Sequence, residues 1–417
     1  MSKPPVIAVL LGAGASADAG IPTTVEMTDA VISRVPPNQK PILEFVYHTL
    51  AAALAQPTRR RWGAATIPQD LDVERLFAAV DLLVDRDAQP WRPFVSSWHP
   101  GLESFAAPPS IRRFDLTSEL RNVASVVGGM VSSGGRTSSA SHPGGRSVEE
   151  AFGRLIERAF EKAEPQGVTQ LIRQARDSML RSLFDLLKID DPHKVDYLTP
   201  LVETARDRGA LVVATLNYDR SVENAAELVG IPCDTGIETW SSQGQLEWSG
   251  SGLRLLKLHG SIDWVVERTS LSAGQLPRVQ IRKVAEEEKD RYERPAVVFG
   301  EAGKLRSEGP YLELLLTWAN ALKEAENLLV IGYSFRDDHV NEFISRWFND
   351  DPAHRIVVVD PEPLASKPFR SFAQELSRVN EPRPGAEPAE SPTRVVQIQE
   401  TTKGGLKAGI EASLSGP

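Results

Sequence analysis

The chain has 417 residues, a formal net charge of −9 and 41% hydrophobic residues, a composition typical of a globular protein. Because the chain is longer than most domains that have a single hydrophobic core, we expect a large domain with a second lobe or a long insertion. The acidic balance argues against general binding to nucleic-acid backbone, and the single cysteine, Cys233, excludes an intrachain disulfide framework and a zinc site built from several cysteines.

The first residues predict a strand followed by a glycine turn. Residues 6–11 form an unbroken apolar run, which is typical of a parallel strand covered on both faces. The run leads into Gly12-Ala13-Gly14-Ala15-Ser16. Glycines let a backbone approach a pyrophosphate closely, and the N–H groups that open the next helix would face the anion. Similar turns have purely structural roles in many α/β proteins, so this turn alone is a weak signal.

The middle of the chain predicts an inserted helical lobe over residues 41–200. Its amphipathic patterns suggest helices at 43–54, 71–84, 148–163 and 168–187. Within it, the Gly/Ser-rich stretch 131–146 has no apolar periodicity. Such a composition cannot bury enough surface to order itself, so we expect a mobile loop there.

After the lobe, strand-like runs alternate with helices. Strands are expected at residues 211–215, 253–258, 296–299, 328–331 and 355–359, with helices at 311–326 and 339–348. This alternation predicts a doubly wound, Rossmann-like α/β domain with a parallel sheet, formed by residues 1–40 and 201–379. Residues 380–417 are expected to be a linker and a C-terminal tail, with a possible edge strand at 393–399. The absence of a leader, a long apolar run and paired cysteines predicts a cytoplasmic protein.

Polar side chains follow several of these strands. Asn217 and Asp219 come directly after the run 211–215. The amide of Asn217 can donate to a ribose hydroxyl or orient a water, and the carboxylate of Asp219 can accept from a hydroxyl. The alternative for both residues is that they cap the helix predicted near Ser221.

His259 is the best general-base candidate among the seven histidines, because it ends a strand and precedes Gly260. A structural, hydrogen-bonded histidine is the alternative. The cluster Asp337-Asp338-His339 could suggest a metal, but one turn supplies too few ligands and a helix N-cap explains it equally well, so no metal is expected.

Two further positions suit a nucleotide. Gly332 and Ser334 form a second strand-to-helix glycine turn, which suits close passage of a phosphate or a ribose. Asp360 ends the following strand, where an acidic residue often receives a ribose hydroxyl. A solvated loop carboxylate is the alternative for Asp360.

Taken together, these motifs resemble the sirtuin-like superfamily in their order and spacing. The resemblance covers residues 6–35 and about 210–360, and Lys257-Leu258-His259-Gly260-Ser261-Ile262-Asp263-Trp264 is similar to the bacterial sirtuin-like domains of antiphage defence. It implies that the glycine turn holds the pyrophosphate of NAD, that the asparagine and histidine flank the nicotinamide ribose, and that the later Gly-x-Ser contacts the adenosine half. By position, these roles fall to Gly12, Gly14, Ser16, Asn217, His259, Gly332 and Ser334. Ala13, Asp219 and Asp360 complete the residues that we expect to bind NAD.

The chain departs from the zinc-containing sirtuin deacylases. It has one cysteine where their zinc ribbon has four, and Thr23-Thr24-Val25 follows Gly20-Ile21-Pro22 where they carry Asp-Phe-Arg. We therefore expect an NAD glycohydrolase, with water as the acceptor, Asn217 and His259 as catalytic residues, NAD as substrate and no second cofactor. The alternatives are an NAD-dependent protein deacylase or ADP-ribosyltransferase, and a non-catalytic NAD or ADP-ribose sensor.

The resemblance to defence proteins also implies control of the activity, since an unrestrained NAD hydrolase would kill its host. We expect a homo-oligomer. A separately encoded helicase-type ATPase or an Argonaute-like protein is the partner that the resemblance suggests. Direct binding to nucleic acid or to a membrane is not expected.

Overall fold

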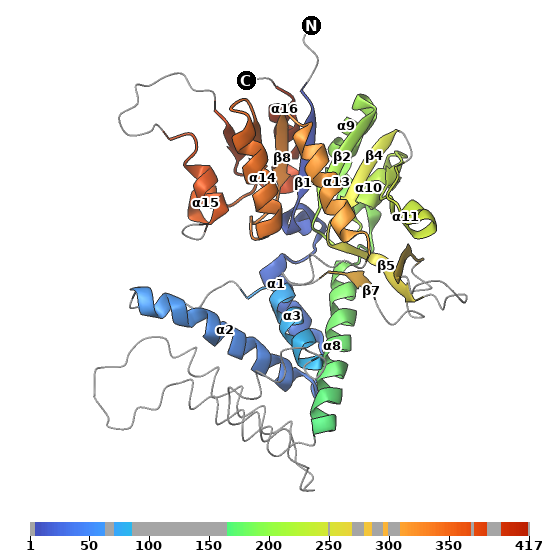
Figure 1. Ribbon diagram of the computed structural model, residues 1–417, viewed down its shortest axis with the longest axis vertical. Helices are drawn as coiled ribbons and strands as arrows, with labels where there is room; N and C mark the ends of the chain where they lie inside the picture. Colours follow the sequence, from blue (N-terminus) through green and yellow to red (C-terminus); the bar gives the residue numbers. More distant parts are fainter. Residues whose placement is uncertain are drawn as a thin grey trace. The chain divides into compact units, whose positions relative to one another are not determined.

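The computed structural model describes residues 5–62, 71–85, 165–248, 251–268, 279–285, 295–298, 309–367, 371–381 and 393–415. The chain divides into two compact units, one formed by Met1–Thr23 with Leu187–Pro417 and the other by Thr24–Leu186. Figure 1 colours the chain along its sequence. The second unit begins and ends earlier in the chain than the lobe predicted at 41–200.

A seven-stranded sheet forms the centre of the first unit, in the order β10-β9-β8-β1-β2-β4-β3, and every pair in it is parallel. Its strands are β1 (Ile7–Leu11), β2 (Ala210–Thr215), β3 (Cys233–Asp234), β4 (Gly252–Lys257), β8 (Asn327–Ile331), β9 (Arg355–Val359) and β10 (Val395–Ile398). The apolar run at the N-terminus forms β1, which is buried along its whole length between β8 and β2.

Helices cover both faces of this sheet, as Figure 1 shows, so the fold is the predicted doubly wound α/β class. Because side chains alternate along a strand, Val9 and Leu11 pack into one layer and Leu10 packs into the other. The Val9 layer contains α9 (Thr199–Arg208), α10 (Ser221–Leu228), α16 (Thr402–Leu414) and the 3-10 helix η4 (Pro192–Leu198). The Leu10 layer contains α11 (Ile237–Gln243), α13 (Tyr311–Lys323), α14 (Asp338–Asp350), α15 (Phe372–Ser377) and η6 (Leu364–Ser366).

A second sheet corrects one prediction. The strand expected at 296–299 is not part of the parallel sheet: β7 (Pro295–Val297) pairs with β5 (Gly260–Arg268), which also pairs with β6 (Val279–Lys283), and both pairs are antiparallel. The chain leaves the parallel sheet at Gly260, which has φ +87, and a Cβ there would lie 2.1 Å from the carbonyl oxygen of Ala296. A short apolar run carries no sign of which sheet it will join, which is why the prediction was wrong.

The C-terminal residues extend the first unit. Strand β10 forms the edge of the parallel sheet within the range 393–399. Helix α16 then packs on β8 and β9, where a tail had been predicted. Its apolar residues Leu406 and Ile410 are buried in the Val9 layer. Of the linker expected at 380–392, residues 382–392 lie outside the described residues.

The second unit is helical over the part of it that is described. It contains α1 (Thr24–Arg34), α2 (Lys40–Trp62), α3 (Val73–Val84) and α8 (Pro165–Leu187). Asp72 caps α3 by accepting a hydrogen bond from the N–H of Arg75 (2.8 Å), and Arg176 of α8 pairs with Asp81 of α3. The predicted loop 131–146 and helix 148–163 lie outside the described residues. None of the described helices is both long enough and apolar enough to cross a membrane.

Candidate active site

The predicted site residues follow the carboxyl ends of strands in the parallel sheet. The strand order reverses at β1, because the next strands along the chain lie on its β2 side and the last three lie on its β8 side. In open α/β sheets the ligand crevice lies at such a reversal, outside the carboxyl ends of the strands. The candidates are distributed as follows: Gly12, Ala13, Gly14 and Ser16 after β1, Asn217 and Asp219 after β2, His259 after β4, Gly332 and Ser334 after β8, and Asp360 after β9.

The two glycine turns pack against each other at this reversal. Gly12 N–H donates to the carbonyl of Ile331 (3.0 Å), and Gly14 N–H donates to that of Gly332 (2.8 Å). A Cβ on Gly12 would lie 2.7 Å from the Gly332 oxygen, and a Cβ on Gly332, which has φ +58, would lie 2.3 Å from the nitrogen of Ala15. The glycines are therefore needed for contact between two stretches of backbone. The Gly14 N–H, assigned to a pyrophosphate by resemblance, is engaged within the protein.

Asn217 joins the end of β2 to the turn after β1. Its side-chain Nδ2 donates to the carbonyl of Gly12 (2.8 Å) and to Oγ of Ser16 (3.0 Å), while its own backbone N–H donates to Oγ1 of Thr215 (3.1 Å). The side chain is half-buried. The structure thus brings together Asn217 and Ser16, which are far apart in the sequence.

Asp219 is buried and fixes the turn that opens α10. Its Oδ1 accepts from the backbone N–H of Ser221 (2.9 Å) and from the hydroxyl of the same residue. The hydroxyl oxygens of Ser221 and Ser16 lie 3.1 Å apart. Because each hydroxyl has one hydrogen and a carboxylate only accepts, the chain of donors runs from Asn217 through Ser16 and Ser221 to Asp219. Asp219 therefore supports Asn217 from within the protein.

His259 is buried and held by a carboxylate that the sequence analysis missed. Its Nε2 lies 3.1 Å from Oδ2 of Asp337, and both side chains are almost inaccessible to solvent. The other oxygen of Asp337 caps α14 by accepting from the N–H groups of His339 (3.1 Å) and Val340 (3.3 Å). The helix cap predicted at this position is present, and the same residue also orients the imidazole. A carboxylate bound to one ring nitrogen fixes the tautomer and the ring plane of a histidine.

Ser334 and Asp360 follow the carboxyl ends of β8 and β9. Ser334 is exposed, whereas Asp360 is buried and its carboxylate accepts from the N–H of Glu362 (2.8 Å). Nζ of Lys367 lies 3.5 Å from the carboxylate of Asp360 and 2.5 Å from that of Glu362. Burial raises the pKa of Asp360, and the charge of Lys367 opposes that rise. Asp360 is thus an ion-paired residue and not the solvated loop carboxylate that was its alternative.

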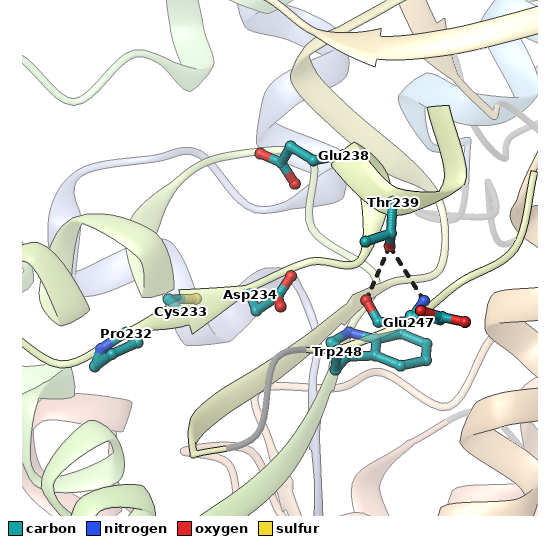
Figure 2. A pocket seen from close by; sticks show the side chains of 7 residues that line it. All are labelled: Pro232, Cys233, Asp234, Glu238, Thr239, Glu247 and Trp248. Atoms are coloured by element: carbon teal, nitrogen blue, oxygen red, sulfur yellow. Dashed lines mark hydrogen bonds between the residues drawn. The ribbon is translucent and has the colours of Figure 1, made fainter. Parts of the chain in front are cut away.

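A pocket of about 550 Å³ lies away from all of these residues, beside β3 and α11. Figure 2 shows the side chains that line it, which are Pro232, Cys233, Asp234, Glu238, Thr239, Glu247 and Trp248. Burial raises the pKa of the Cys233 thiol, so the protein keeps it protonated at neutral pH. No group of three or more His, Cys, Asp or Glu side chains that could hold a metal ion occurs in the described part of the chain.

Comparison with known proteins finds similarity to Sir2 structures and to one family model. No curated protein matches the chain. Among solved structures, a Sir2 homolog–NAD complex has a TM-score of 0.37 at 11% identity, covering 99% of this chain and 90% of that one. A Sir2–p53 peptide–NAD⁺ structure has a TM-score of 0.36 at 11% identity, covering 98% and 94%.

The match to a family is confined to part of the sheet domain. Residues 211–378 fit the family model described as a SIR2-like domain. This range contains Asn217, His259 and Asp337, while the glycine turn after β1 precedes it and joins the same sheet through strand pairing. Residues 211–378, which carry these three side chains, are therefore similar to SIR2-like domains.

Proposed function

We propose that this protein is an NAD glycohydrolase, which uses water to cleave the bond between nicotinamide and ribose and releases nicotinamide and ADP-ribose. The observation that carries the proposal is that Asn217 and His259 follow the carboxyl ends of neighbouring strands, β2 and β4, within the SIR2-like domain. Asp337, which follows β8, holds the imidazole of His259. The single cysteine of the chain supports hydrolysis over deacylation, because a zinc ribbon with four cysteines cannot form.

The proposed chemistry assigns each residue a separate task. As the glycosidic bond breaks, its electron pair leaves with nicotinamide, which becomes neutral, and positive charge develops on the ribose. A water oxygen then bonds to the anomeric carbon and loses a proton. His259, oriented by Asp337, accepts that proton or one from a ribose hydroxyl. Asn217 orients the ribose or the water through its amide, which needs a fixed position.

The turns at the strand ends supply the proposed binding surface for NAD. We assign the pyrophosphate to the turn that contains Gly12, Ala13, Gly14 and Ser16, and the adenosine half to Gly332, Ser334 and Asp360. Since the N–H of Gly14 bonds Gly332 and the N–H of Ala15 bonds Gly12, the N–H of Ala13, the first residue of the 3-10 helix η1 (Ala13–Ala19), would contact the phosphates. Asp219 acts indirectly in this proposal, through the two serines that connect it with Asn217.

The proposed biological role is that of a cytoplasmic antiphage effector that depletes NAD when triggered. It rests on the resemblance of residues 257–264 to the bacterial defence domains. Such an enzyme must be restrained, so we propose that it works as a homo-oligomer or with a separately encoded helicase-type ATPase or Argonaute-like protein.

Product analysis tests the proposed activity. Purified full-length protein, over a range of concentrations, would be incubated with NAD, with and without an acetylated peptide, and the products separated by liquid chromatography and identified by mass spectrometry. We expect nicotinamide and linear or cyclic ADP-ribose without the peptide. Nicotinamide that appears only with the peptide, together with acetyl-ADP-ribose, would assign deacylation instead. ADP-ribose attached to protein would assign transfer, and NAD binding in calorimetry without any product would assign a sensor.

A further inference from the structure

Lys257, at the end of β4, is a buried cation in the sheet domain. Its side chain has 0% exposure, and its ammonium group donates to Oε1 of Glu223 (2.9 Å) and to the backbone carbonyl of Asp219. Glu223 lies on α10 and is itself 5% exposed. Lys257 and Glu223 therefore form an ion pair inside the protein, and the second contact of the ammonium group is with the loop after β2.

A second pair of charges lies next to the first. Nε of Arg220 is 3.4 Å from Oδ2 of Asp263, a buried residue on β5. Burial raises the pKa of Glu223, Lys257 opposes that rise, and the negative charge of Asp263 adds to it. Lys257 is thus the cation that opposes the effect of burial on Glu223, next to a second buried carboxylate, that of Asp263.

Stability alone gives little reason for such a pair. Removing two charges from water has a large cost, and apolar residues of similar volume often replace a buried ion pair without loss of stability. The neighbouring residues of β4, Leu255 and Leu256, already pack into the apolar layers on either side of the sheet. An apolar pair at the positions of Lys257 and Glu223 would therefore extend these layers, at the cost of the hydrogen bond to the carbonyl of Asp219.

The position of Lys257 relative to the candidate catalytic residues gives a functional reason for the buried ion pair. Its backbone belongs to β4, two residues before His259, and its ammonium group holds Asp219, two residues after Asn217. Backbone hydrogen bonds flank this contact: Leu258 N–H donates to the carbonyl of Thr215 (3.0 Å). The side chain of Lys257 thus connects the strand that carries the histidine with the loop that carries the asparagine.

We propose that Lys257 is a positioning residue, which fixes Asn217 relative to His259 for the cleavage of NAD. This inference rests on the proposed function. Lys257 contacts neither the substrate nor the reacting atoms in this role. It acts through the carbonyl of Asp219, whose side chain supports Asn217 through Ser221 and Ser16.

The test replaces the pair together, because a single change would leave the other charge buried and could unfold the protein. The variant is Lys257→Met/Glu223→Leu, and the matched control is Arg282→Met/Glu267→Leu, which removes a half-exposed pair (3.1 Å) between β6 and β5. For each, we would measure kcat and KM for nicotinamide release from NAD, the melting temperature, and hydrogen exchange of residues 216–222 by mass spectrometry.

We expect the Lys257→Met/Glu223→Leu variant to fold and to keep its KM within about threefold of the wild type. Its kcat should fall at least about tenfold, and the backbone amides of residues 216–222 should exchange their hydrogens faster. The control should match the wild type in kcat and in the exchange of this segment. A folded Lys257→Met/Glu223→Leu variant with wild-type kcat would overturn the proposal, as would an equal loss in the control.

Failure of the proposed function can be distinguished from failure of the positioning role, because the wild type would then release no nicotinamide at any protein concentration. Hydrogen exchange, which needs no NAD, then decides whether Lys257 fixes the loop after β2. Unchanged exchange of residues 216–222 in a folded Lys257→Met/Glu223→Leu variant would overturn the positioning role. Should neither this variant nor a milder Lys257→Arg variant fold, Lys257 is required for the fold and the positioning role is rejected.

Discussion

Asn217 and His259 should each be needed for turnover, because they have different tasks in the proposed reaction. Replacing Asn217 by Ala removes the amide that bonds Gly12 and Ser16, and replacing His259 by Ala removes the imidazole held by Asp337. We expect each change to lower kcat for nicotinamide release by a factor of about 10² or more. The double variant should lose less than the product of the two effects, since both residues serve one step.

A histidine and an asparagine outside the candidate site provide the control variants for this experiment. His193→Ala removes an exposed histidine that lies 3.3 Å from Asp196, and Asn320→Ala removes an exposed asparagine of α13. Both variants should keep wild-type kcat. If Asn217→Ala or His259→Ala folds normally by circular dichroism and still hydrolyses NAD at the wild-type rate, that residue has no place in the mechanism.

Gly332 offers a test of the contact between the two glycine turns. An alanine there adopts a left-handed backbone conformation, which costs about 1–2 kcal/mol, and its Cβ would also meet the backbone of Ala15 at 2.3 Å. Gly230 has a similar φ, +65, but nothing lies within 4 Å of a Cβ there. We expect Gly332→Ala to lower the free energy of unfolding by clearly more than Gly230→Ala, measured by urea denaturation.

The binding of NAD distinguishes the two glycine variants further. Only Gly332→Ala should weaken NAD binding in calorimetry, because only that change displaces the turn after β1. Equal losses of stability and equal affinities would show that the contact between the turns contributes nothing beyond the strain of a left-handed residue.

The sequence predicted the positions of the site residues better than their contacts. Polar residues after apolar runs mark strand ends, so the places of Ser16, Asn217 and His259 after β1, β2 and β4 could be predicted from pattern alone. Their role in a site stays a prediction. Asp337 could not be assigned as the partner of His259, because the two are separated by 78 positions in the chain and its sequence context explains it fully as a helix cap. Side-chain pairs between distant segments depend on packing that no local pattern encodes.

At the scale of elements, helix α16 joins the sheet through close glycine contacts. A Cβ on Gly405 would lie 2.7 Å from Cγ1 of Val359, and one on Gly409 would lie 2.6 Å from Cγ2 of the same residue. Gly404 is exposed, and a Cβ there would meet only the end of the Glu400 side chain, at 3.0 Å. Two of these three glycines therefore let the helix approach β9.

Alanine at these positions should have opposite effects on stability. We expect Gly405→Ala and Gly409→Ala each to lower the free energy of unfolding by about 1–3 kcal/mol through overpacking. Gly404→Ala should raise it by up to about 1 kcal/mol, because alanine is the better helix former. Urea denaturation measures all three. A stabilising Gly409→Ala would mean that α16 is not packed against β9 in solution.

The same helix illustrates which elements a sequence reveals. The buried parallel strands β1, β2, β8 and β9 are short unbroken apolar runs, so their positions follow from composition. Helix α16 begins Thr402-Lys403-Gly404-Gly405, which argues locally against a helix, and tertiary packing against β8 and β9 overrides that preference. Strand β6 reads Val-Gln-Ile-Arg-Lys, in which charged residues obscure the alternation of a half-exposed strand.

At the scale of the whole molecule, the chain passes between its two units next to the glycine turn after β1. It leaves the first unit at Thr23, just after η1, and returns at Leu187. Soon after the return, the hydroxyl of Tyr197 on η4 donates to the carbonyl of Ala15 in that turn (2.7 Å). Burial raises the pKa of Tyr197, so it remains a neutral donor at physiological pH. This hydrogen bond therefore joins, within the first unit, a segment that precedes the helical unit in the sequence to one that follows it.

This arrangement leads us to expect that the activity is latent in the isolated subunit and is controlled through the helical unit. Conformational change in an inserted unit can assemble a catalytic site when a partner or a second subunit binds. The specific rate of nicotinamide release should therefore rise with protein concentration, alongside the oligomeric state followed by light scattering. Deleting residues 132–145, whose Gly/Ser composition suits a segment that orders on binding, should alter that dependence and leave the melting temperature unchanged. A monomer that is fully active at nanomolar concentration and insensitive to the deletion would assign the helical unit a purely structural role.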